Sequence, residues 1–262
     1  MGTTITFKNL TIGYRSKHQL RAVASSIHAS LQEDKLTCLI GANGVGKSTL
    51  LRTLSGFQPP LDGEILIQDK PLSDYSAREL AQEIGVVLTN RMDTPQLSVQ
   101  EIIGIGRSPY TGFWGTLSSA DQKIVDEAIR QTGIQHLASR SITELSDGER
   151  QKVMIAKALA QQTSLIILDE PTAFLDFPSK VETLQMRRRL AHEQPKSILL
   201  STHDVELALQ IADQLWLMEE NHLSIGTPKE LAEDGSLSRF IDRDGIRFDV
   251  EKMRVELSST FS

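Results

Sequence analysis

The sequence predicts an α/β fold with a mostly parallel core sheet, an N-terminal antiparallel β subdomain and an inserted helical subdomain. Three continuous apolar runs, at 36–40, 164–168 and 197–200, have the composition of strands that are buried on both faces of a sheet. Helical patterns separate these runs, and buried strands that alternate with helices are typical of a parallel sheet. The stretch between a further strand at 85–88 and the run at 164 has mainly helical spacing.

The N-terminal third is predicted to be rich in half-buried strands. Apolar residues alternate with polar ones over 5–7 and again over 10–14, and similar short runs recur at 27–31 and 63–67. Period-two alternation places one face of each strand on a core and the other toward water. These strands predict the antiparallel subdomain.

The helical subdomain is expected over approximately 90–162. Its helices are indicated by apolar spacing at 99–103, 120–131 and 151–160. Another helix is expected near 179–193, between the second and third buried strands. The whole chain, 1–262, is predicted to be a single domain that includes this insertion.

A C-terminal appendage is expected over approximately 227–262. Thr227, Pro228 and Glu230 combine a helix N-cap, a first-turn proline and the acid of a capping box, so a short helix should follow. Alternation at 246–250 and 253–257 predicts two strands beyond it.

Bulk composition restricts the classes of function. The 262 residues carry a net charge of −6, which disfavours a protein that acts mainly on nucleic acid. No apolar run reaches the roughly 18 to 20 residues that cross a bilayer, and the N-terminus does not resemble a secretory signal, so a cytoplasmic location is expected. The single cysteine, Cys38, lies in an apolar run, where core packing is the expected role.

A glycine-rich loop predicts a nucleotide-binding site. Residues 41–48, GANGVGKS, match the Walker A pattern G-x-x-x-x-G-K-[ST] between a predicted strand and a predicted helix. Backbone N–H groups of such a loop and the helix N-terminus bind phosphates, Lys47 reaches the β- and γ-phosphates, and the Ser48 hydroxyl ligates Mg²⁺. The expected nucleotide-binding residues here are Gly41, Asn43, Gly44, Gly46, Lys47, Ser48 and Thr49.

Two adjacent carboxylates follow the second buried strand. Asp169 and Glu170 stand where sites form in parallel sheets, at the carboxyl ends of strands. Asp169 is expected to hold Mg²⁺ and Glu170 to polarise the attacking water. Each motif has an alternative interpretation, a glycine-rich turn at 41–48 and a simple turn before Pro171. The occurrence of both motifs in one chain favours ATP hydrolysis instead.

A second anion site is expected at another helix start. Residues 145–149, LSDGE, precede a helical pattern, and Ser146 with Glu149 form a capping box. The free N–H groups and positive dipole end of such a helix favour an anion. With this element the sequence resembles an ATP-binding cassette (ABC) ATPase, whose signature is L-S-G-G-Q or L-S-G-G-E. The resemblance covers nearly the whole chain and implies a P-loop NTPase fold.

The resemblance assigns further roles. It implies that Ser146 and Gly148 of one copy contact the ATP held by another copy, and that Tyr14 stacks on adenine. It also implies that His203 contacts the γ-phosphate and that residues 173–176, AFLD, form the D-loop. The expected catalytic residues are therefore Glu170, His203 and Lys47, and the expected metal ligands are Ser48 and Asp169.

Two positions depart from the family pattern. Thr89 stands where the Q-loop glutamine is usual, so a shorter hydroxyl side chain replaces an amide. The two expectations are that Asn90 or an extra water substitutes for the amide, or that sensing of the γ-phosphate is weaker. Asp147 replaces the first glycine of the signature. An acid favours the helix dipole but repels a γ-phosphate, so its side chain is expected to point away from the ATP.

Residues 106–112, GRSPYTG, with 117–118 and Asp121, are similar to ATPases of bacterial importers for iron-siderophores, haem and cobalamin. The alternative is a proline-containing turn between two helices. The importer resemblance implies a homodimer, separate integral-membrane permease subunits, an extracytoplasmic substrate-binding protein, and a peripheral position on the cytoplasmic face of the membrane. The segment 89–107 would then form part of the groove for the permease.

Two other classes of nucleotide-binding protein are alternatives to an importer ATPase. A non-transport ABC ATPase in iron-sulfur assembly or in nucleic-acid or ribosome work remains an alternative, although the chain has neither an inserted coiled coil nor a second cassette. A P-loop kinase or GTPase has no use for the signature or for His203.

Overall fold

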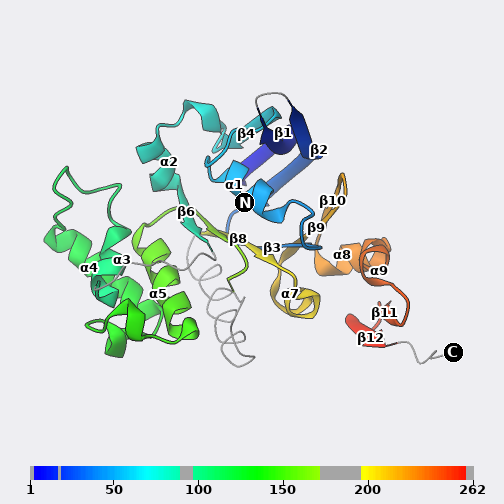
Figure 1. Ribbon diagram of the computed structural model, residues 1–262. Coiled ribbons are helices and arrows are strands. Elements are labelled where there is room, and N and C mark those ends of the chain that lie inside the picture. Colours follow the sequence, from blue (N-terminus) through cyan, green and yellow to red (C-terminus); the bar gives the residue numbers. More distant parts are fainter. Residues whose placement is uncertain (1–2, 17–18, 89–96, 172–195, 258–262) are drawn as a thin grey trace.

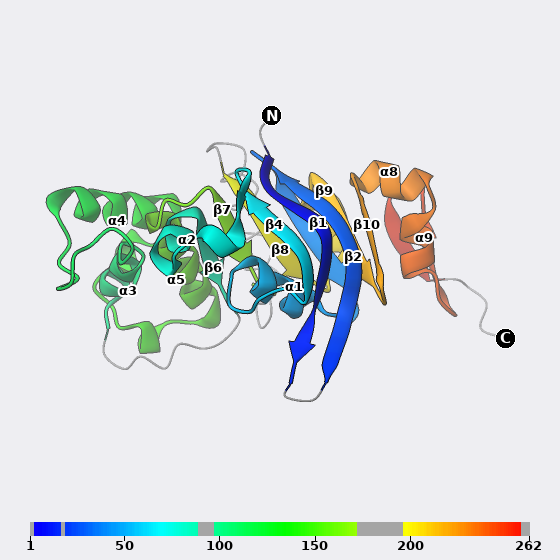
Figure 2. The same ribbon diagram turned by 90° about the horizontal axis from the view of Figure 1, so that it is seen from above.

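The computed structural model describes residues 3–16, 19–88, 97–171 and 196–257. The described chain has a central α/β layer with helices α3, α4 and α5 on one side and the C-terminal elements on the other (Figures 1 and 2). The predicted fold class is confirmed. Thr89, residues 173–176 and the helix expected at 179–193 lie outside the described residues.

The core sheet is mostly parallel, as expected. Among the described residues its strand order is β10-β9-β3-β8-β7-β6, in which only the edge strand β10 pairs antiparallel. Its strands are β3 (Leu36–Gly41), β6 (Ile84–Val87), β7 (Leu165–Leu168), β8 (Ser197–Thr202), β9 (Gln214–Glu219) and β10 (His222–Gly226). The last two strands were not predicted from the sequence, and β9 pairs directly with β3 at the centre of the sheet.

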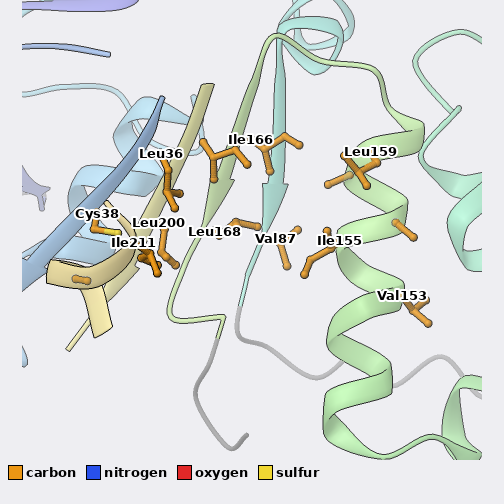
Figure 3. Packing of buried hydrophobic residues seen from close by; sticks show 14 of the residues in the cluster. Leu36, Cys38, Val87, Val153, Ile155, Leu159, Ile166, Leu168, Leu200 and Ile211 are labelled. Carbon is orange, nitrogen blue, oxygen red and sulfur yellow. The ribbon is translucent and has the colours of Figure 1, made fainter. Parts of the chain in front are cut away.

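The continuous apolar runs are explained by burial on both faces. Alternate residues of β3 belong to two different hydrophobic clusters, with Leu36, Cys38 and Ile40 in one and Leu39 in the other. The first cluster packs against α5, where Ile155 points toward the sheet (Figure 3). The expected core role of Cys38 is confirmed, since its side chain is fully buried.

The antiparallel subdomain has the strand order β2-β1-β4-β5. Its strands are β1 (Thr3–Arg15), β2 (Leu20–Gln32), β4 (Asp62–Ile67) and β5 (Lys70–Pro71). The alternating segments at 5–7 and 10–14 are one strand, β1, rather than two. Asn9 has a φ of 49° between them, and the pairing with β2 shifts register between Phe7 and Leu10. This bulge keeps both apolar segments on the same buried face.

The helices agree with the predicted pattern in most places. They are α1 (Lys47–Leu54), α2 (Ala77–Glu83), α3 (Val99–Ile105), α4 (Ser119–Gln131), α5 (Asp147–Ala160), α7 (Val205–Ile211), α8 (Pro228–Glu233) and α9 (Ser236–Ile241). The capping box of Thr227 and Glu230 at the start of α8 is confirmed. Strands β11 (Ile246–Asp249) and β12 (Arg254–Leu257) are the two expected C-terminal strands, and they pair antiparallel with each other.

The segment 106–112 follows α3 and contacts the end of α5. Gly106 is required because a Cβ there would lie 2.3 Å from the carbonyl oxygen of Lys157. The buried Arg107 donates from Nη1 to the carbonyl of Ala160, 2.8 Å away, and so satisfies the C-terminus of α5. Its Nε lies 2.9 Å from Asp121 Oδ1, and its guanidinium stacks 4.0 Å from the centre of the Tyr110 ring.

Asp121 couples this arginine to the start of α4. Its carboxylate accepts hydrogen bonds from the Ser118 hydroxyl and N–H, at 2.6 and 3.0 Å, as well as from Arg107. The Ser118 hydroxyl, then the Arg107 guanidinium, lower the pKa of Asp121 from 3.8 to about 2. The carboxylate therefore stabilises the fold in its charged form.

We expect Asp121→Asn to lower the thermal midpoint at neutral pH, with a difference from the parent that shrinks as the pH falls. The depressed pKa means that Asp121 contributes stability above pH 3.8, which is lost as the pH falls toward about 2. Circular dichroism melts between pH 7 and pH about 2.5 measure this. Asp126→Asn, at an exposed position of the same helix, is the matched control. A pH-independent difference between Asp121→Asn and the parent would contradict the argument.

Candidate functional site

The glycine-rich loop links β3 to α1 in the expected way. Gly46 occupies the N-cap of α1 with a φ of 117°, a left-handed conformation that favours glycine. A Cβ at Gly46 would lie 2.4 Å from Val23 Cγ1. Because no side chain caps α1, the N–H groups of its first turn are directed at the loop and can bind an anion.

Lys47 places its ammonium group beneath the loop. The side chain is buried, and Nζ donates to the carbonyl oxygens of Gly41 and Ala42, at 2.8 and 3.2 Å. Nζ also lies 3.7 Å from Glu170 Oε1. The positive charge is thus held between the loop and the acidic end of β7, where the phosphates of a nucleotide would be neutralised.

The acidic pair lies at the end of β7, next to β8. Ser201 donates its hydroxyl to Asp169 Oδ1 at 2.7 Å and accepts from the Glu170 N–H at 2.8 Å. Glu170 has a φ of 43°, an unfavourable conformation for a residue with a side chain, and Ser201 is one of the contacts that holds it. Ser201 therefore orients the Asp169 carboxylate and holds the backbone of Glu170.

His203 lies at the end of the neighbouring strand. Its Nδ1 is 4.0 Å from Glu170 Oε2, and its side chain is 57% exposed. The ring is therefore placed at the open side of the site and not in the core. The order of strands brings His203, Glu170 and Lys47 into one chain of contacts.

A cavity of about 410 Å³ contains most of the predicted site residues. It is lined by the loop and α1 on one side, by the acidic pair on another and by Tyr14 at its edge. The lining residues that the sequence predicted are Tyr14, Asn43, Gly44, Gly46, Lys47, Ser48, Thr49, Asp169 and Glu170. Gly41 and His203 do not line the cavity but contact residues that do. The Gly41 carbonyl accepts a hydrogen bond from Lys47, and His203 lies beside Glu170.

Tyr14 lies at the rim of the cavity with half of its surface exposed. Its hydroxyl is 2.8 Å from Thr49 Oγ1, so the ring lies along the start of α1. An exposed aromatic face beside a phosphate loop can stack on a nucleobase. The hydrogen bond to Thr49 was not expected from the sequence.

Ser146 and Gly148 lie apart from this cavity, at the start of α5. The predicted capping box is confirmed, because Glu149 N donates to Ser146 Oγ at 3.3 Å and Ser146 N donates to Glu149 Oε2 at 2.8 Å. The Ser146 N–H, then the Ser146 hydroxyl, donate to the Glu149 carboxylate and lower its pKa. Neither Ser146 nor Gly148 is among the residues that line the cavity.

Three residues of the site were missed in the sequence. Arg21 and Val23 of β2 line the cavity, and Ser201 bonds the Asp169 carboxylate and the Glu170 N–H. Ser201 could have been found as a polar residue at the end of a buried strand. Arg21 could not have been predicted, because its position at the cavity depends on the pairing register of β1 and β2, which sets it opposite Tyr14.

Comparison with known proteins gives one consistent family. Residues 24–173 match the family model described as ABC transporter. The chain is 38% identical to an uncharacterized ABC transporter ATP-binding protein of Methanocaldococcus jannaschii, over 90% of this chain and 80% of that protein. It is 34% identical to the ferric enterobactin transport ATP-binding protein of Escherichia coli, over 86% of this chain and 82% of that protein.

A solved structure shares the fold over most of the chain. The protein cbiO1 of Clostridium perfringens, part of the ABC transporter complex cbiONQ, superposes with a TM-score of 0.79 at 28% identity. The match covers 91% of this chain and 94% of that one. In the part of the chain that the structure describes, no helix combines the length and apolar character needed to span a membrane.

We expect Ser201→Ala to slow ATP hydrolysis roughly tenfold while the affinity for ATP changes little, because two hydrogen bonds that orient the acidic pair are lost. Phosphate release measures hydrolysis, and equilibrium binding of a fluorescent ATP analogue measures affinity. Ser224→Ala, on the half-buried edge strand β10, is the control. A variant that hydrolyses ATP at the parental rate would contradict the role given to Ser201.

Proposed function

The chain belongs to the ABC transporter family, and from that premise we propose that two copies of this ATPase close on two Mg²⁺-ATP molecules and power a membrane importer for a metal complex. The observation that carries the proposal is the chain of contacts from Lys47 through Glu170 to His203, three residues that follow three different strands. Phosphoryl transfer requires mainly positioning and charge stabilisation, which such a cluster provides.

The site residues are given distinct roles in hydrolysis. Glu170 accepts a hydrogen bond from the attacking water, whose oxygen bonds to the γ-phosphorus as the bond to the ADP oxygen breaks. Lys47 and the loop N–H groups stabilise the phosphate charge, and His203 contacts the γ-phosphate from the open side. Its position 4.0 Å from Glu170 supports this assignment.

The donors that line the cavity fit Mg²⁺. The exposed hydroxyl of Ser48 and the carboxylate of Asp169 both lie along it, and oxygen ligands of this kind suit that ion. When bound, Mg²⁺ would neutralise charge on the β- and γ-phosphates. Ser201 keeps Asp169 oriented for this role.

A second copy is proposed to complete each site. Ser146 and Gly148 form an anion-binding helix start, yet they do not line the cavity of their own chain. A two-fold dimer would place the signature of each copy on the nucleotide of the other. ATP would then join the two copies, and its hydrolysis would release them.

The permease is proposed to dock at a groove between the antiparallel and helical parts. A cavity of about 680 Å³ lies there, lined in part by Phe57, Tyr75, Leu80 and Val86. Phe57 is 62% exposed, and an exposed aromatic beside an apolar cavity is typical of a protein-binding surface. Val86 of β6 lies shortly before the segment 89–107, which was expected to form part of the permease groove. The last residue of that segment, Arg107, forms an ion pair with Asp121.

The cargo is proposed to be an iron complex, such as a siderophore or haem, or cobalamin. The name of the Escherichia coli relative and the similarity of residues 106–112 to importer ATPases support this class. In such a system the ATPase lies on the cytoplasmic face of the membrane beneath the permease, and an extracytoplasmic substrate-binding protein delivers the cargo. Non-transport work is the less supported alternative.

We expect Glu170→Gln to reduce ATP hydrolysis at least about 100-fold and to form a stable dimer with Mg²⁺-ATP, because the amide cannot accept the proton of the attacking water. Size-exclusion chromatography with light scattering measures the dimer. Lys47→Ala is the control, which should remain monomeric since phosphate binding is lost. A Glu170→Gln chain that stays monomeric at saturating ATP would exclude the two-copy site.

Affinity purification of the chain from detergent-solubilised membranes tests the transport assignment. The expected result is co-purification with a polytopic permease, and Phe57→Asp should reduce the recovery of that permease because it places a charge in the apolar groove. Asp126→Lys, at an exposed position of α4 outside the lining of this groove, is the control. Recovery with ribosomes or sulfur-assembly proteins and without a permease would refute the importer proposal.

A further inference from the structure

The nucleotide cavity contains two pairs of side chains in contact. In one pair, Lys47 Nζ lies 3.7 Å from Glu170 Oε1, beside the place proposed for the attacking water. In the other, the Tyr14 hydroxyl lies 2.8 Å from Thr49 Oγ1. A nucleotide that stacks its base on Tyr14 and turns its terminal phosphate to Lys47 and Glu170 would bring its α-phosphate, the one nearest the base, to Thr49.

The hydroxyl of Thr49 has a different partner from two later hydroxyls of the same helical segment. Thr53 and Ser55 donate their hydroxyls to the carbonyls one turn earlier, those of Thr49 and Leu51, at 2.8 and 2.7 Å. Serine and threonine commonly make this bond in helices, and it occupies their only proton. Thr49, which is just 5% exposed, instead pairs its hydroxyl with a side chain of β1, that of Tyr14.

A second link between β1 and α1 holds Tyr14 beside Thr49. Gln58 Nε2 donates to the carbonyl of Gly13 and to Thr53 Oγ1, at 3.1 and 3.2 Å. The Thr53 hydroxyl donates in turn to the Thr49 carbonyl. The residue before Tyr14 and the backbone of Thr49 are thus joined by side chains, in addition to the contact of the two hydroxyls. The position of the Tyr14 hydroxyl is therefore fixed by the fold.

The contact of the two hydroxyls can respond to an anion without movement of heavier atoms. Each hydroxyl has one proton and can either donate or accept. A phosphate oxygen accepts only, so it favours the arrangement in which Thr49 donates to the phosphate and Tyr14 donates to Thr49. Hydrogen bonds in such a chain polarise one another, and a charged acceptor strengthens the last of them.

We infer that the Tyr14 hydroxyl positions the Thr49 hydroxyl as a donor to the α-phosphate, a role separate from stacking of the Tyr14 ring on the base. The inference rests on the proposed function and deepens it, because it gives Tyr14 a part in phosphate recognition. Without the phenol hydroxyl, Thr49 would turn its proton to a backbone carbonyl, as Thr53 does. A phosphate would then have to replace that bond before it could accept from Thr49.

Binding of ligands with and without a base tests this role. Tyr14→Phe keeps the aromatic ring and removes the hydroxyl. It should raise the Kd of Mg²⁺-ADP and of Mg²⁺-tripolyphosphate, which has no base, by the same factor of about threefold to tenfold. Isothermal titration calorimetry measures both constants, and neither ligand requires hydrolysis.

Tyr110→Phe is the matched control for this substitution. It removes a hydroxyl that donates to the Gln161 carbonyl at 3.0 Å, outside the lining of the nucleotide cavity, and should leave both Kd values unchanged. A Tyr14→Phe chain with parental affinity for tripolyphosphate would overturn the inference. If its affinity for ADP alone is reduced, the hydroxyl serves the base, and the inference also fails.

A double-mutant cycle tests whether Tyr14 acts through Thr49. Thr49→Val removes the donor hydroxyl with little change of shape and should weaken both ligands more than Tyr14→Phe does. In the Thr49→Val background, Tyr14→Phe should change either Kd by less than about twofold, because no donor remains to be positioned. In the Thr49→Ser background, which keeps a hydroxyl, the effect of Tyr14→Phe should return. Equal losses in the Thr49→Val and parent backgrounds would show that Tyr14 acts independently and would exclude the proposed role.

The outcomes also distinguish this inference from the proposed function. A parent chain that binds neither Mg²⁺-ADP nor Mg²⁺-tripolyphosphate contradicts both. A parent that binds both ligands, with Tyr14→Phe binding them equally well, overturns only the role of the Tyr14 hydroxyl. The two-copy site then still stands on dimer formation by Glu170→Gln.

Discussion

The parallel pairing of β3 with β8 and of β8 with β7 is the constraint on which the rest of the molecule depends. The register joins Ile40 to Thr202 and Leu168 to Leu200, so the carboxyl ends of the three strands lie along one edge. All three strands are buried on both faces, and a shift of one residue would exchange every side chain between the two hydrophobic clusters. Hydrophobic burial therefore fixes the relative positions of the phosphate loop, the acidic pair and the histidine.

At that edge the chain departs from relaxed geometry. Gly46 has a left-handed backbone, and Glu170 shares that region of φ although it carries a side chain. Such a conformation persists only where the surroundings hold it, and the hydroxyl of Ser201 bonds both the Glu170 N–H and Asp169. The paired strands β7 and β8 thus support one strained residue, Glu170, at the end of β7.

The sequence predicted those parts of the fold that leave a local pattern. Buried strands, capped helices and the phosphate loop each have a characteristic composition, and the structure bears them out. Strand β9 was missed, although 215–218 is apolar, and its position next to β3 depends on tertiary pairing. The burial of Arg107 also has no local signal, because a hydrophobic pattern marks buried apolar residues and counts an arginine as exposed. Its role emerges only when Asp121 and the end of α5 meet it.

Both halves of the proposed anion site satisfy their own hydrogen-bonding groups within one chain. Lys47 is held by Gly41 and Ala42, and the Ser146 hydroxyl by Glu149. Lys47 and Ser146 therefore each have a partner within their own chain while the copies are apart. Binding of ATP would exchange these internal hydrogen bonds for bonds to phosphate, and an exchange yields much less net free energy than a new bond would. A closure built from exchanges is readily reversed when hydrolysis removes the γ-phosphate, as a repeating transport cycle requires.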